Sequence, residues 1–407
     1  MQSVRFIGTN SPLNDIQTAT IQECKAYCES KTVLGVDTET EGFDFTCKKL
    51  IMFQIGDKDR QYVIDTRDVE IEPLREVLES NKIVKVLHNA KFDYKFIKMW
   101  AGISMEEMYD TFLAERVINC GKQDYGYSLA ACTERYLGVT LDKETRNKFV
   151  GLKGQPFTVD QITYGANDVV YLLDIREKQL VKIHSLELQQ VTRLENKVVK
   201  VFSEIEFEGL MIDEDKWTAM AEQNVKLAFE QELKLDDMVL EHPLLQHYRV
   251  PVQVDMFASI DEVRKTHIKW SSPMQTLELF RNLVPDLEDV NGKKLNKHRY
   301  KHKLIDEYIR YKERTKLANA YGTKFFNYVN CDGKVHTNFS QILDTGRVSS
   351  SKPNMQQIPS DNTFRNCFIT EPGWVFVSSD YSSQELNVIA YGSQDPVWLD
   401  ALEKGLD

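Results

Sequence analysis

The chain has 407 residues, of which 42% are hydrophobic and 10% aromatic, and its formal net charge is −11. At about 150 residues per domain, this length predicts two or three domains. The sequence has no run of about 18 apolar residues, which excludes a predicted membrane span. Its first residues lack the charged and apolar segments of an export signal, so we expect a cytoplasmic protein with no membrane contact.

The first part of the chain, residues 32–175, alternates strand-like and helix-like segments. Val33–Val36 is an apolar strand that ends in acidic residues, and Leu50–Gly56 with Gln61–Asp65 predicts a hairpin. Ile83–Leu87 is rich in β-branched residues and predicts a further strand. These segments predict that the first domain contains a sheet.

Helical signals follow these strands. Phe92 and Phe96 are four residues apart, the spacing of one helix face. Thr158-Val159-Asp160-Gln161 has the pattern of a capping box and predicts a helix that runs to about Lys182. Strands and helices that alternate in this way predict an α/β domain around a mixed sheet.

Beyond about residue 186 the pattern becomes helical. One helix is predicted by an apolar stripe that Gly209 closes, and a second long helix is expected from about Tyr300 to Tyr328. The first stripe consists of Leu194, Val198, Val201, Phe202 and Ile205. One side of the second helix carries Leu304, Tyr308, Tyr311, Thr315 and Ala318. The stretch from Pro243 to Gly292 is mixed and predicts no single element.

The last region combines strands with one helix that starts near Ser383. Asp332-Gly333 predicts a hairpin turn between Tyr328–Cys331 and Lys334–Phe339. Val375–Asp380 predicts a strand that ends in an acid. We therefore expect domains at residues 1–185, 186–330 and 331–407.

The seven cysteines are scattered along the chain. Cys24 and Cys28 would share a helix face, but no second pair of ligands accompanies them. A zinc site and disulfides are the alternatives, and the spacing favours free thiols in a reducing compartment.

The net negative charge of the chain does not exclude a nucleic-acid partner, because binding depends on local patches of positive charge. One basic patch lies within residues 293–316, where only three acids oppose it. Its members are Lys293, Lys294, Lys297, Arg299, Lys301, Lys303, Arg310, Lys312, Arg314 and Lys316. The alternative interpretation is a solvated helix face.

Four carboxylates and a tyrosine carry the first chemical signal. Alternation along a strand puts Asp37 and Glu39 on the same side. Asp93 follows another strand, and Tyr164 and Asp168 are four apart on the capped helix, so they share a face. Converging carboxylates repel one another unless cations are present. Two divalent ions can stabilise the attacking and leaving oxygens of a phosphodiester, and Mg²⁺, or Mn²⁺, suits carboxylate ligands.

These segments read Asp-x-Glu, His-Asn-x-x-Phe-Asp and Tyr-x-x-x-Asp. In order and spacing they resemble the signature of the DEDD exonucleases, tyrosine subtype, which form the proofreading domain of family A DNA polymerases. The resemblance covers about residues 30–185 and departs at no metal-ligand position. It implies an RNase H-like fold and 3′–5′ exonuclease activity on a single-stranded 3′ end of DNA, with two Mg²⁺ ions.

The same resemblance implies a role for each residue. Asp37 would bridge both ions, Glu39 and Asp168 would hold one, and Asp93 would hold the second largely through water. Tyr164 would position the nucleophilic water. Asn89 would support the strand end or the substrate, and we interpret Asp110 as structural.

A second set of motifs lies near the end of the sequence. It comprises Thr345-Gly346-Arg347-Val348-Ser349-Ser350, Pro353-Asn354-Met355-Gln356 and Asp380-Tyr381-Ser382-Ser383-Gln384-Glu385-Leu386. These segments resemble the palm of family A DNA polymerases. The implied substrate is a DNA primer-template.

The palm resemblance also implies residue roles. Arg347 would reach the minor groove. Every base pair presents hydrogen-bond acceptors there, so a donor at this place tests the geometry of pairing without reading the base sequence. Asn354 and Gln356 would make further template-primer contacts. Asp380 would bind both catalytic Mg²⁺ ions with help from the Tyr381 carbonyl. Glu385 would act as the steric gate that excludes a 2′-hydroxyl.

The family's common form of the last motif is Asp-Tyr-Ser-Gln-Ile-Glu-Leu-Arg. Here Ser383, Gln384 and Asn387 stand at three of its positions, so the expected metal ligand and steric gate are kept while their neighbours differ from the family form. In the helical region, Glu206–Leu210 with Asp213 resembles the start of the polymerase thumb. Lys312–Tyr321 resembles the helix that grips duplex DNA, where Lys312, Arg314 and Lys316 would contact phosphates.

The sequence ends at Asp407, before the fingers helix and the second palm carboxylate that family A catalysis requires. We therefore expect the N-terminal part of a split polymerase, or a truncated product, with a phage-like compact form and an incomplete α+β palm. The expected partner is a C-terminal polymerase fragment that supplies fingers and the remaining palm. The alternatives are a free-standing DEDD exonuclease and a non-catalytic DNA-binding assembly subunit.

Overall fold

The computed structural model describes residues 3–9, 16–122, 125–141, 152, 154–250 and 265–405. The chain divides into two compact units, Met1–Phe368 and Ile369–Asp407. Among the described residues, no helix combines the length and apolarity that crossing a membrane requires.

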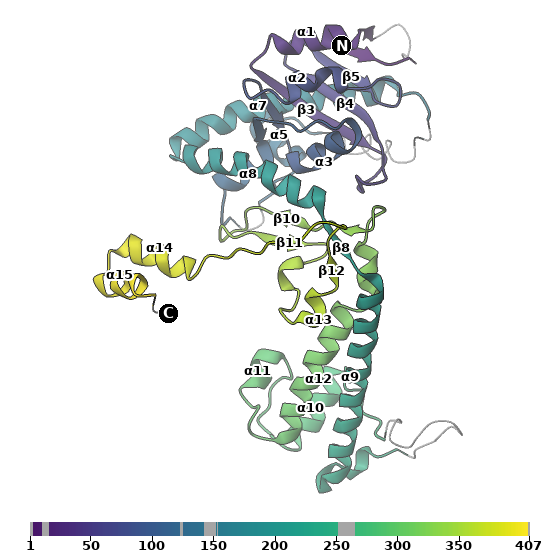
Figure 1. Cartoon of the computed structure of the whole chain (residues 1–407), viewed down its shortest axis with the longest axis vertical. Helices are drawn as coiled ribbons and strands as arrows, with labels where there is room; N and C mark the ends of the chain where they lie inside the picture. The colour runs from purple at the N-terminus through teal and green to yellow at the C-terminus, as the bar shows by residue number, and fades with distance from the viewer. Residues whose placement is uncertain are drawn as a thin grey trace. The chain divides into compact units, whose positions relative to one another are not determined.

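The first unit begins with a seven-stranded sheet of order β2-β1-β5-β4-β3-β6-β7 (Figure 1). Its strands are β1 (Val4–Ile7), β2 (Gln17–Thr18), β3 (Val33–Thr40), β4 (Leu50–Gly56), β5 (Gln61–Asp65), β6 (Val84–Leu87) and β7 (Met108–Asp110). The pairs β3–β4 and β4–β5 are antiparallel, and the other neighbours are parallel. The predicted mixed sheet and the β4–β5 hairpin are confirmed. β3 runs through the acidic residues rather than ending at them.

Helices cover both faces of this sheet. They are α1 (Ile21–Glu29), α2 (Arg75–Leu78) with the short helix η1 (Glu72–Leu74), α3 (Ala90–Ala101), α4 (Thr111–Ile118), α5 (Leu129–Leu137) and α7 (Val159–Ser185). The Thr158–Gln161 capping box that opens α7 is present. Leu34 and Val36 of β3 pack in one core with residues of α1 and α3. The alternate β3 residue Gly35 faces α7.

Helix α8 (Gln189–Glu208) ends at Gly209, as predicted. Its apolar stripe, however, does not form the buried face: Leu194, Val201 and Ile205 are 57%, 54% and 48% exposed. The buried residues of α8 are Thr192, Val199, Ser203 and Glu206. This buried side is mainly polar, and lysines of α3 neutralise its Glu206, a partnership that a hydrophobic pattern does not reveal.

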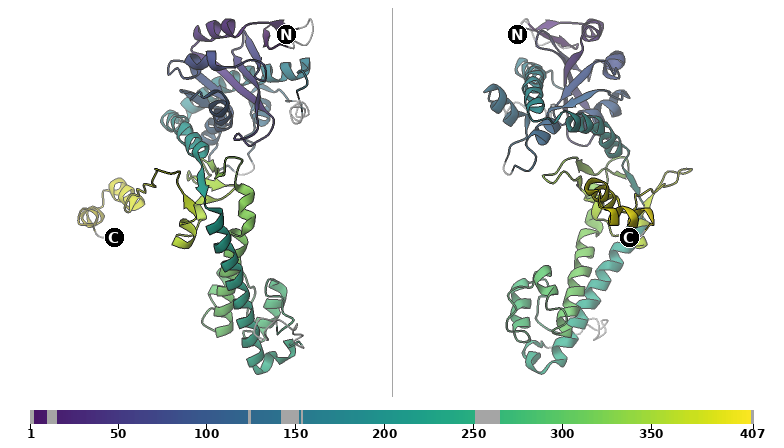
Figure 2. Two further views of the ribbon diagram at one scale, coloured as in Figure 1. Left: turned by 45° about the vertical axis from the view of Figure 1, so that its right-hand side comes forward. Right: turned by 90° about the vertical axis from the view of Figure 1, so that its left-hand side faces the viewer.

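A pair of long antiparallel helices forms the next part of the first unit. α9 (Glu214–Glu241) and α12 (Lys303–Ala320) lie side by side (Figures 1 and 2). Shorter elements complete this part, namely η2 (Pro243–Tyr248), α10 (Pro273–Arg281), α11 (Gly292–Asn296) and η4 (Thr323–Tyr328). The predicted second helix is therefore real but ends at Ala320. Residues 251–264 of the mixed stretch lie outside the described residues.

Short strands complete the first unit. They are β8 (Leu210–Ile212), β9 (Lys334–Val335), β10 (Asn338–Ser340) and β11 (Ser349–Ser351), with the short helices η5 (Met355–Gln357) and α13 (Asn362–Arg365). The strand β12 (Phe368–Ile369) includes the last residue of this unit and the first of the next. The Asp332-Gly333 turn is confirmed: the Asn330 amide donates to the Lys334 carbonyl at 2.9 Å, and Val329 bridges Val335.

The second unit corrects two expectations. It holds two helices, α14 (Gln384–Ser393) and α15 (Pro396–Glu403), where one was predicted. The predicted strand Val375–Asp380 is absent, and Val375, Phe376 and Val377 are 79%, 58% and 88% exposed. A strand forms only when a neighbour accepts its hydrogen bonds, and the described residues of this unit offer none to it.

All seven cysteines are free thiols in the structure. Cys24 and Cys28 are buried on one face of α1, with their Sγ atoms 4.0 Å apart. Cys47 and Cys331 are exposed.

Candidate nuclease site and nucleic-acid interface

The pleat of β3 separates three neighbouring side chains. Asp37 and Glu39 point to one face, where both are half-buried, and Thr38 points to the other face, where it is buried. Alternation therefore aligns the two carboxylates along one side of the strand.

Two glycines let α7 approach that side of the sheet closely. A Cβ on Gly35 of β3 would lie 2.6 Å from the Val169 carbonyl oxygen, and a Cβ on Gly165 of α7 would lie 2.5 Å from Nε2 of Gln54. A larger residue at Gly35 would force the backbone to shift, and one at Gly165 would force the Gln54 side chain to move. This contact brings Asp168, the residue before Val169, against β3.

The close approach assembles three carboxylates. Ligand oxygens of Asp37, Glu39 and Asp168 all lie within 4.8 Å of one another. Asp168 is buried. A cluster of hard carboxylate oxygens at this spacing could hold a divalent cation.

Asp93, on the first turn of α3, lies next to this cluster but outside the three-carboxylate group. Its Oδ1 accepts a 2.6 Å hydrogen bond from the Thr38 hydroxyl. Burial, and then the negative charge of Asp37, raise the pKa of Asp93 well above its usual range. A nearby cation would oppose that shift, because it favours the charged carboxylate.

The remaining predicted nuclease residues lie near these carboxylates. Tyr164 is on α7, one turn before Asp168, and packs against the small core that includes Ile51 and Met52. Asn89 precedes α3 with a left-handed φ of 64°, and its backbone amide donates to Asp110 at 2.9 Å.

Asp110 has the structural role predicted for it. It is buried, caps α4, and accepts hydrogen bonds from the backbone amides of Asn89, Ala90, Phe112 and Leu113. Burial raises the pKa of Asp110, and these donors partly offset that rise. The carboxylate thus joins the start of α3 to the start of α4.

Two residues at this site were missed by the sequence analysis. Thr38 holds Asp93, and its position between two acids was the available signal. Gln54 is fully buried opposite Asp37 on β4, and its amide finds no hydrogen-bond partner within the part of the chain that the structure describes. Its signal was a lone polar residue inside the apolar strand Leu50–Gly56.

The predicted primer-template residues of the first unit lie around β11. Arg347 is exposed at a tight turn, where Gly346 has a φ of 77°. The side chains of Asn354 and Gln356 both accept hydrogen bonds from Ser350. The Ser350 hydroxyl donates to Asn354 at 3.1 Å, and the Ser350 amide donates to Gln356 at 2.8 Å. These two side chains hold the strand that follows Arg347.

The three basic residues of α12 differ in their surroundings. Lys312 donates to the Val290 carbonyl at 2.7 Å, and Arg314 donates to the Leu227 carbonyl at 3.0 Å. Lys316 is exposed. The first two therefore stabilise the helical region itself.

The predicted palm residues of the second unit are all exposed. Asp380 and Tyr381 lie in the irregular segment before α14, and Glu385 is on the first turn of that helix. Among the described residues, no further carboxylate joins Asp380 in a metal-binding group.

Two protein families match this chain. Residues 15–183 match the family described as 3′–5′ exonuclease, and residues 255–407 match DNA polymerase family A. The three clustered carboxylates fall within the first match.

Related proteins match across both regions. DNA polymerase I of Aquifex aeolicus (strain VF5) is 28% identical over 403 residues, and the DNA polymerase of Mycobacterium phage D29 is 24% identical over 412 residues. These alignments cover 93% and 92% of this chain. The chain spans 63% of each of these two relatives and 41% of DNA polymerase I of Borreliella burgdorferi.

The fold is also similar to that of a solved polymerase. The POL domain of Pol1 from M. smegmatis, in complex with DNA primer-template and dNTP, has a TM-score of 0.70 and 20% sequence identity, and the match covers 95% of this chain and 64% of that one. The chain therefore carries a 3′–5′ exonuclease domain followed by a region of DNA polymerase family A.

Proposed function

We propose that this chain removes nucleotides from single-stranded 3′ ends of DNA, as the proofreading activity of a family A polymerase. The convergence of Asp37, Glu39 and Asp168 carries the proposal, because like charges repel one another at this spacing and a bound cation would offset that repulsion.

The donor set fits a hard divalent cation, and we propose Mg²⁺ as the natural ion. When bound, such ions stabilise the oxygens of the phosphodiester and lower the pKa of the attacking water. Asp37, Glu39 and Asp168 would hold the ion, and Asp93, fixed by Thr38, would support a second through water. Tyr164 would accept or donate a hydrogen bond that orients the water.

The direct test is the double substitution Asp37→Ala/Glu39→Ala, assayed on a 3′-labelled single strand with Mg²⁺. We expect degradation to fall by at least about 10³-fold, since the cluster would lose two of its three ligands. Asp59→Ala, at an exposed acid on the β4–β5 turn, is the control and should degrade DNA as the unaltered chain does. Persistent degradation by the double variant would refute the assignment.

We further propose that the helical region and residues around β11 bind primer-template DNA. Exposed Lys316 would contact phosphate and exposed Arg347 the minor groove. Lys316→Ala should weaken duplex binding and reduce the salt dependence by about one counterion. Lys82→Ala is the matched control, because Lys82 is also exposed but lies far from Lys316 in the sequence. It should bind duplex DNA as the unaltered chain does.

For DNA synthesis, Asp380 would supply one metal carboxylate, with Glu385 as the steric gate. The other ligands of a two-metal centre would come from polypeptide beyond these 407 residues, in the same chain or in a second one. We expect no primer extension by the 407 residues alone and restored extension when a polypeptide with family A fingers and palm is added. Extension without that addition would contradict this part of the proposal.

A further inference from the structure

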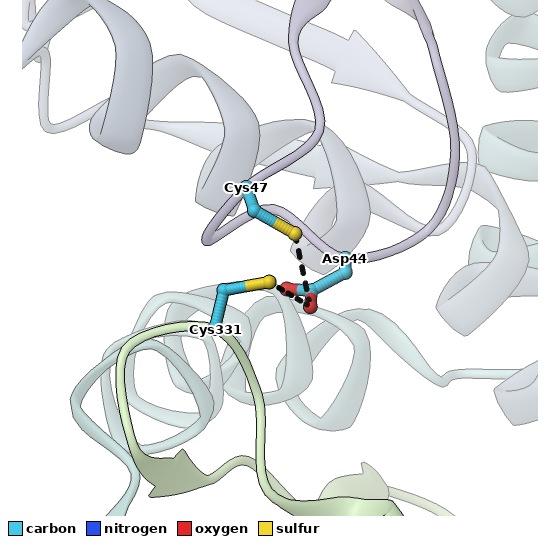
Figure 3. Close-up of side chains that lie close together, drawn as sticks. All are labelled: Asp44, Cys47 and Cys331. Atoms are coloured by element: carbon cyan, nitrogen blue, oxygen red, sulfur yellow. Dashed lines mark hydrogen bonds between the residues drawn. The ribbon is translucent and has the colours of Figure 1, made fainter.

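A second group of potential metal ligands lies outside the nuclease carboxylates. Asp44 and Cys47 lie in the loop between β3 and β4, and Cys331 lies in the turn before β9, almost 300 residues later. Figure 3 shows the three side chains pointing toward one another. Their ligand atoms all lie within 4.8 Å of one another.

The two oxygens of Asp44 have different environments. Oδ1 accepts hydrogen bonds from the Thr46 amide at 3.0 Å, the Thr46 hydroxyl at 2.6 Å and the Asn330 amide group at 2.8 Å. Oδ2 faces the two thiols, with Cys47 Sγ at 3.4 Å and Cys331 Sγ at 3.7 Å. The hydrogen bonds to Oδ1 therefore fix the orientation of the carboxylate, and Oδ2 points at the two sulfur atoms. Outer hydrogen bonds of this kind orient ligands in metal sites.

The sulfur–oxygen distances match those of a tetrahedral zinc site. With Zn–S of about 2.3 Å and Zn–O of about 2.1 Å, tetrahedral angles require S···O distances of about 3.6 Å. The observed values of 3.4 and 3.7 Å lie on either side of this distance. A single cation could therefore contact all three atoms with little movement.

We propose that Asp44, Cys47 and Cys331 bind a thiophilic divalent cation, Zn²⁺, with water as the fourth ligand. On binding, both thiols release their protons to solvent, and two S–Zn bonds and one O–Zn bond replace the S–H···O contacts. Thiolates select soft ions, whereas the oxygen-only cluster of Asp37, Glu39 and Asp168 suits hard ones. The bound ion would link the loop after β3 to the turn before β9 and restrain two segments that are distant in the sequence.

The test uses the whole chain with its thiols reduced and Co²⁺ as a spectroscopic substitute for Zn²⁺. A thiolate–cobalt charge-transfer band should appear at one equivalent and disappear on addition of Zn²⁺. The nuclease carboxylates cannot produce this band, because they contain no sulfur. The melting temperature should also rise with Zn²⁺.

Cys47→Ser and Cys331→Ser should each abolish the band and the thermal shift, and Asp44→Asn should weaken Zn²⁺ binding by at least about tenfold. Cys120→Ser is the matched control, because Cys120 is also exposed and its thiol donates to main-chain oxygens of Leu343 and Asp344. Circular dichroism establishes that each variant folds.

Three results would overturn the proposal. One is the absence of the band in the reduced, unaltered chain, and another is its survival in both serine variants. The third is loss of two titratable thiols in air together with no band after reduction, which would identify the pair as a disulfide instead.

Discussion

The Thr38 hydroxyl donates a 2.6 Å hydrogen bond to the buried carboxylate of Asp93. Thr38 stands between Asp37 and Glu39 in the sequence but points to the opposite face of β3, so one tripeptide contributes to both sides of the site. The bond fixes the orientation of Asp93, and it partly opposes the burial and the Asp37 charge that raise the pKa of Asp93.

Thr38→Val therefore tests a positioning role. Valine has nearly the shape of threonine but donates no hydrogen bond, so the fold should persist while Asp93 loses its orientation. We expect the Mg²⁺ concentration for half-maximal exonuclease activity to rise by about 10-fold or more, as for other ligand-orienting residues. Thr38→Ser keeps the hydroxyl and should restore most of the affinity. Equal metal dependence in the two variants would rule the role out.

Gly35→Ala tests the close approach of α7. The added Cβ would meet the Val169 carbonyl oxygen at 2.6 Å, which forces α7 away from β3 and separates Asp168 from Asp37. We expect at least about a tenfold loss of exonuclease activity, since displacements of about 1 Å can cost a hundredfold. Gly292→Ala, where a Cβ would meet nothing within 4 Å, is the control and should leave the rate unchanged.

Local signals in the sequence predicted the elements that depend on local interactions. The Thr158 capping box and the turn of the predicted Leu50–Gly56/Gln61–Asp65 hairpin, where Asp57 bonds Arg60, each join residues three apart within one element or one turn. For the same reason, strand alternation was sufficient to place Asp37 and Glu39 on one face. Local periodicity could not place Asp168 beside Asp37, because α7 and β3 are far apart in the sequence. Its place in the cluster was predicted from the order of the motifs along the chain.

Features that depend on distant partners were not predictable in this way. The stripe containing Leu194 and Val201 is exposed, while the opposite side of α8 buries Glu206, because lysines from α3 reach it. Val375–Asp380 has the composition of a strand but lacks a neighbour among the described residues of its unit. Composition indicates what a segment can form, and the available partners decide what it does form.

Glu206 provides a test of the buried ion pairs. Its carboxylate, which is fully buried, contacts Lys91 and Lys95 and accepts a 2.7 Å hydrogen bond from the Phe339 amide. Glu206→Gln would leave two lysines without their counter-charge, so we expect the free energy of unfolding to fall by about 3–5 kcal/mol. Urea unfolding followed by circular dichroism measures the change.

The matched control is Glu106→Gln, which removes a partly exposed pair with Lys200. Such pairs contribute about 0–1 kcal/mol, so this variant should unfold near the urea concentration of the unaltered chain. Similar losses in the two variants would mean that burial does not strengthen the Glu206 network.

Lys85 predicts a pH dependence of stability. It is fully buried on β6 and donates to the Ser80 and Ile83 carbonyls at 2.6 and 2.7 Å. Burial lowers its pKa to about 8, from 10.5. Between these values Lys85 binds more protons in the unfolded chain than in the folded one, so its contribution to the free energy of unfolding rises with pH.

The expected rise from Lys85 is about 2 kcal/mol between pH 8 and pH 10. Lys85→Met removes the titrating group, so its unfolding free energy should lack this rise, whatever its absolute stability. Lys82→Met, at an exposed lysine three residues earlier, should keep the rise because Lys85 is still present. Urea unfolding at pH 8, 9 and 10 compares the three chains. Parallel pH profiles for the Lys85→Met chain and the unaltered chain would show that Lys85 titrates alike in the folded and unfolded states.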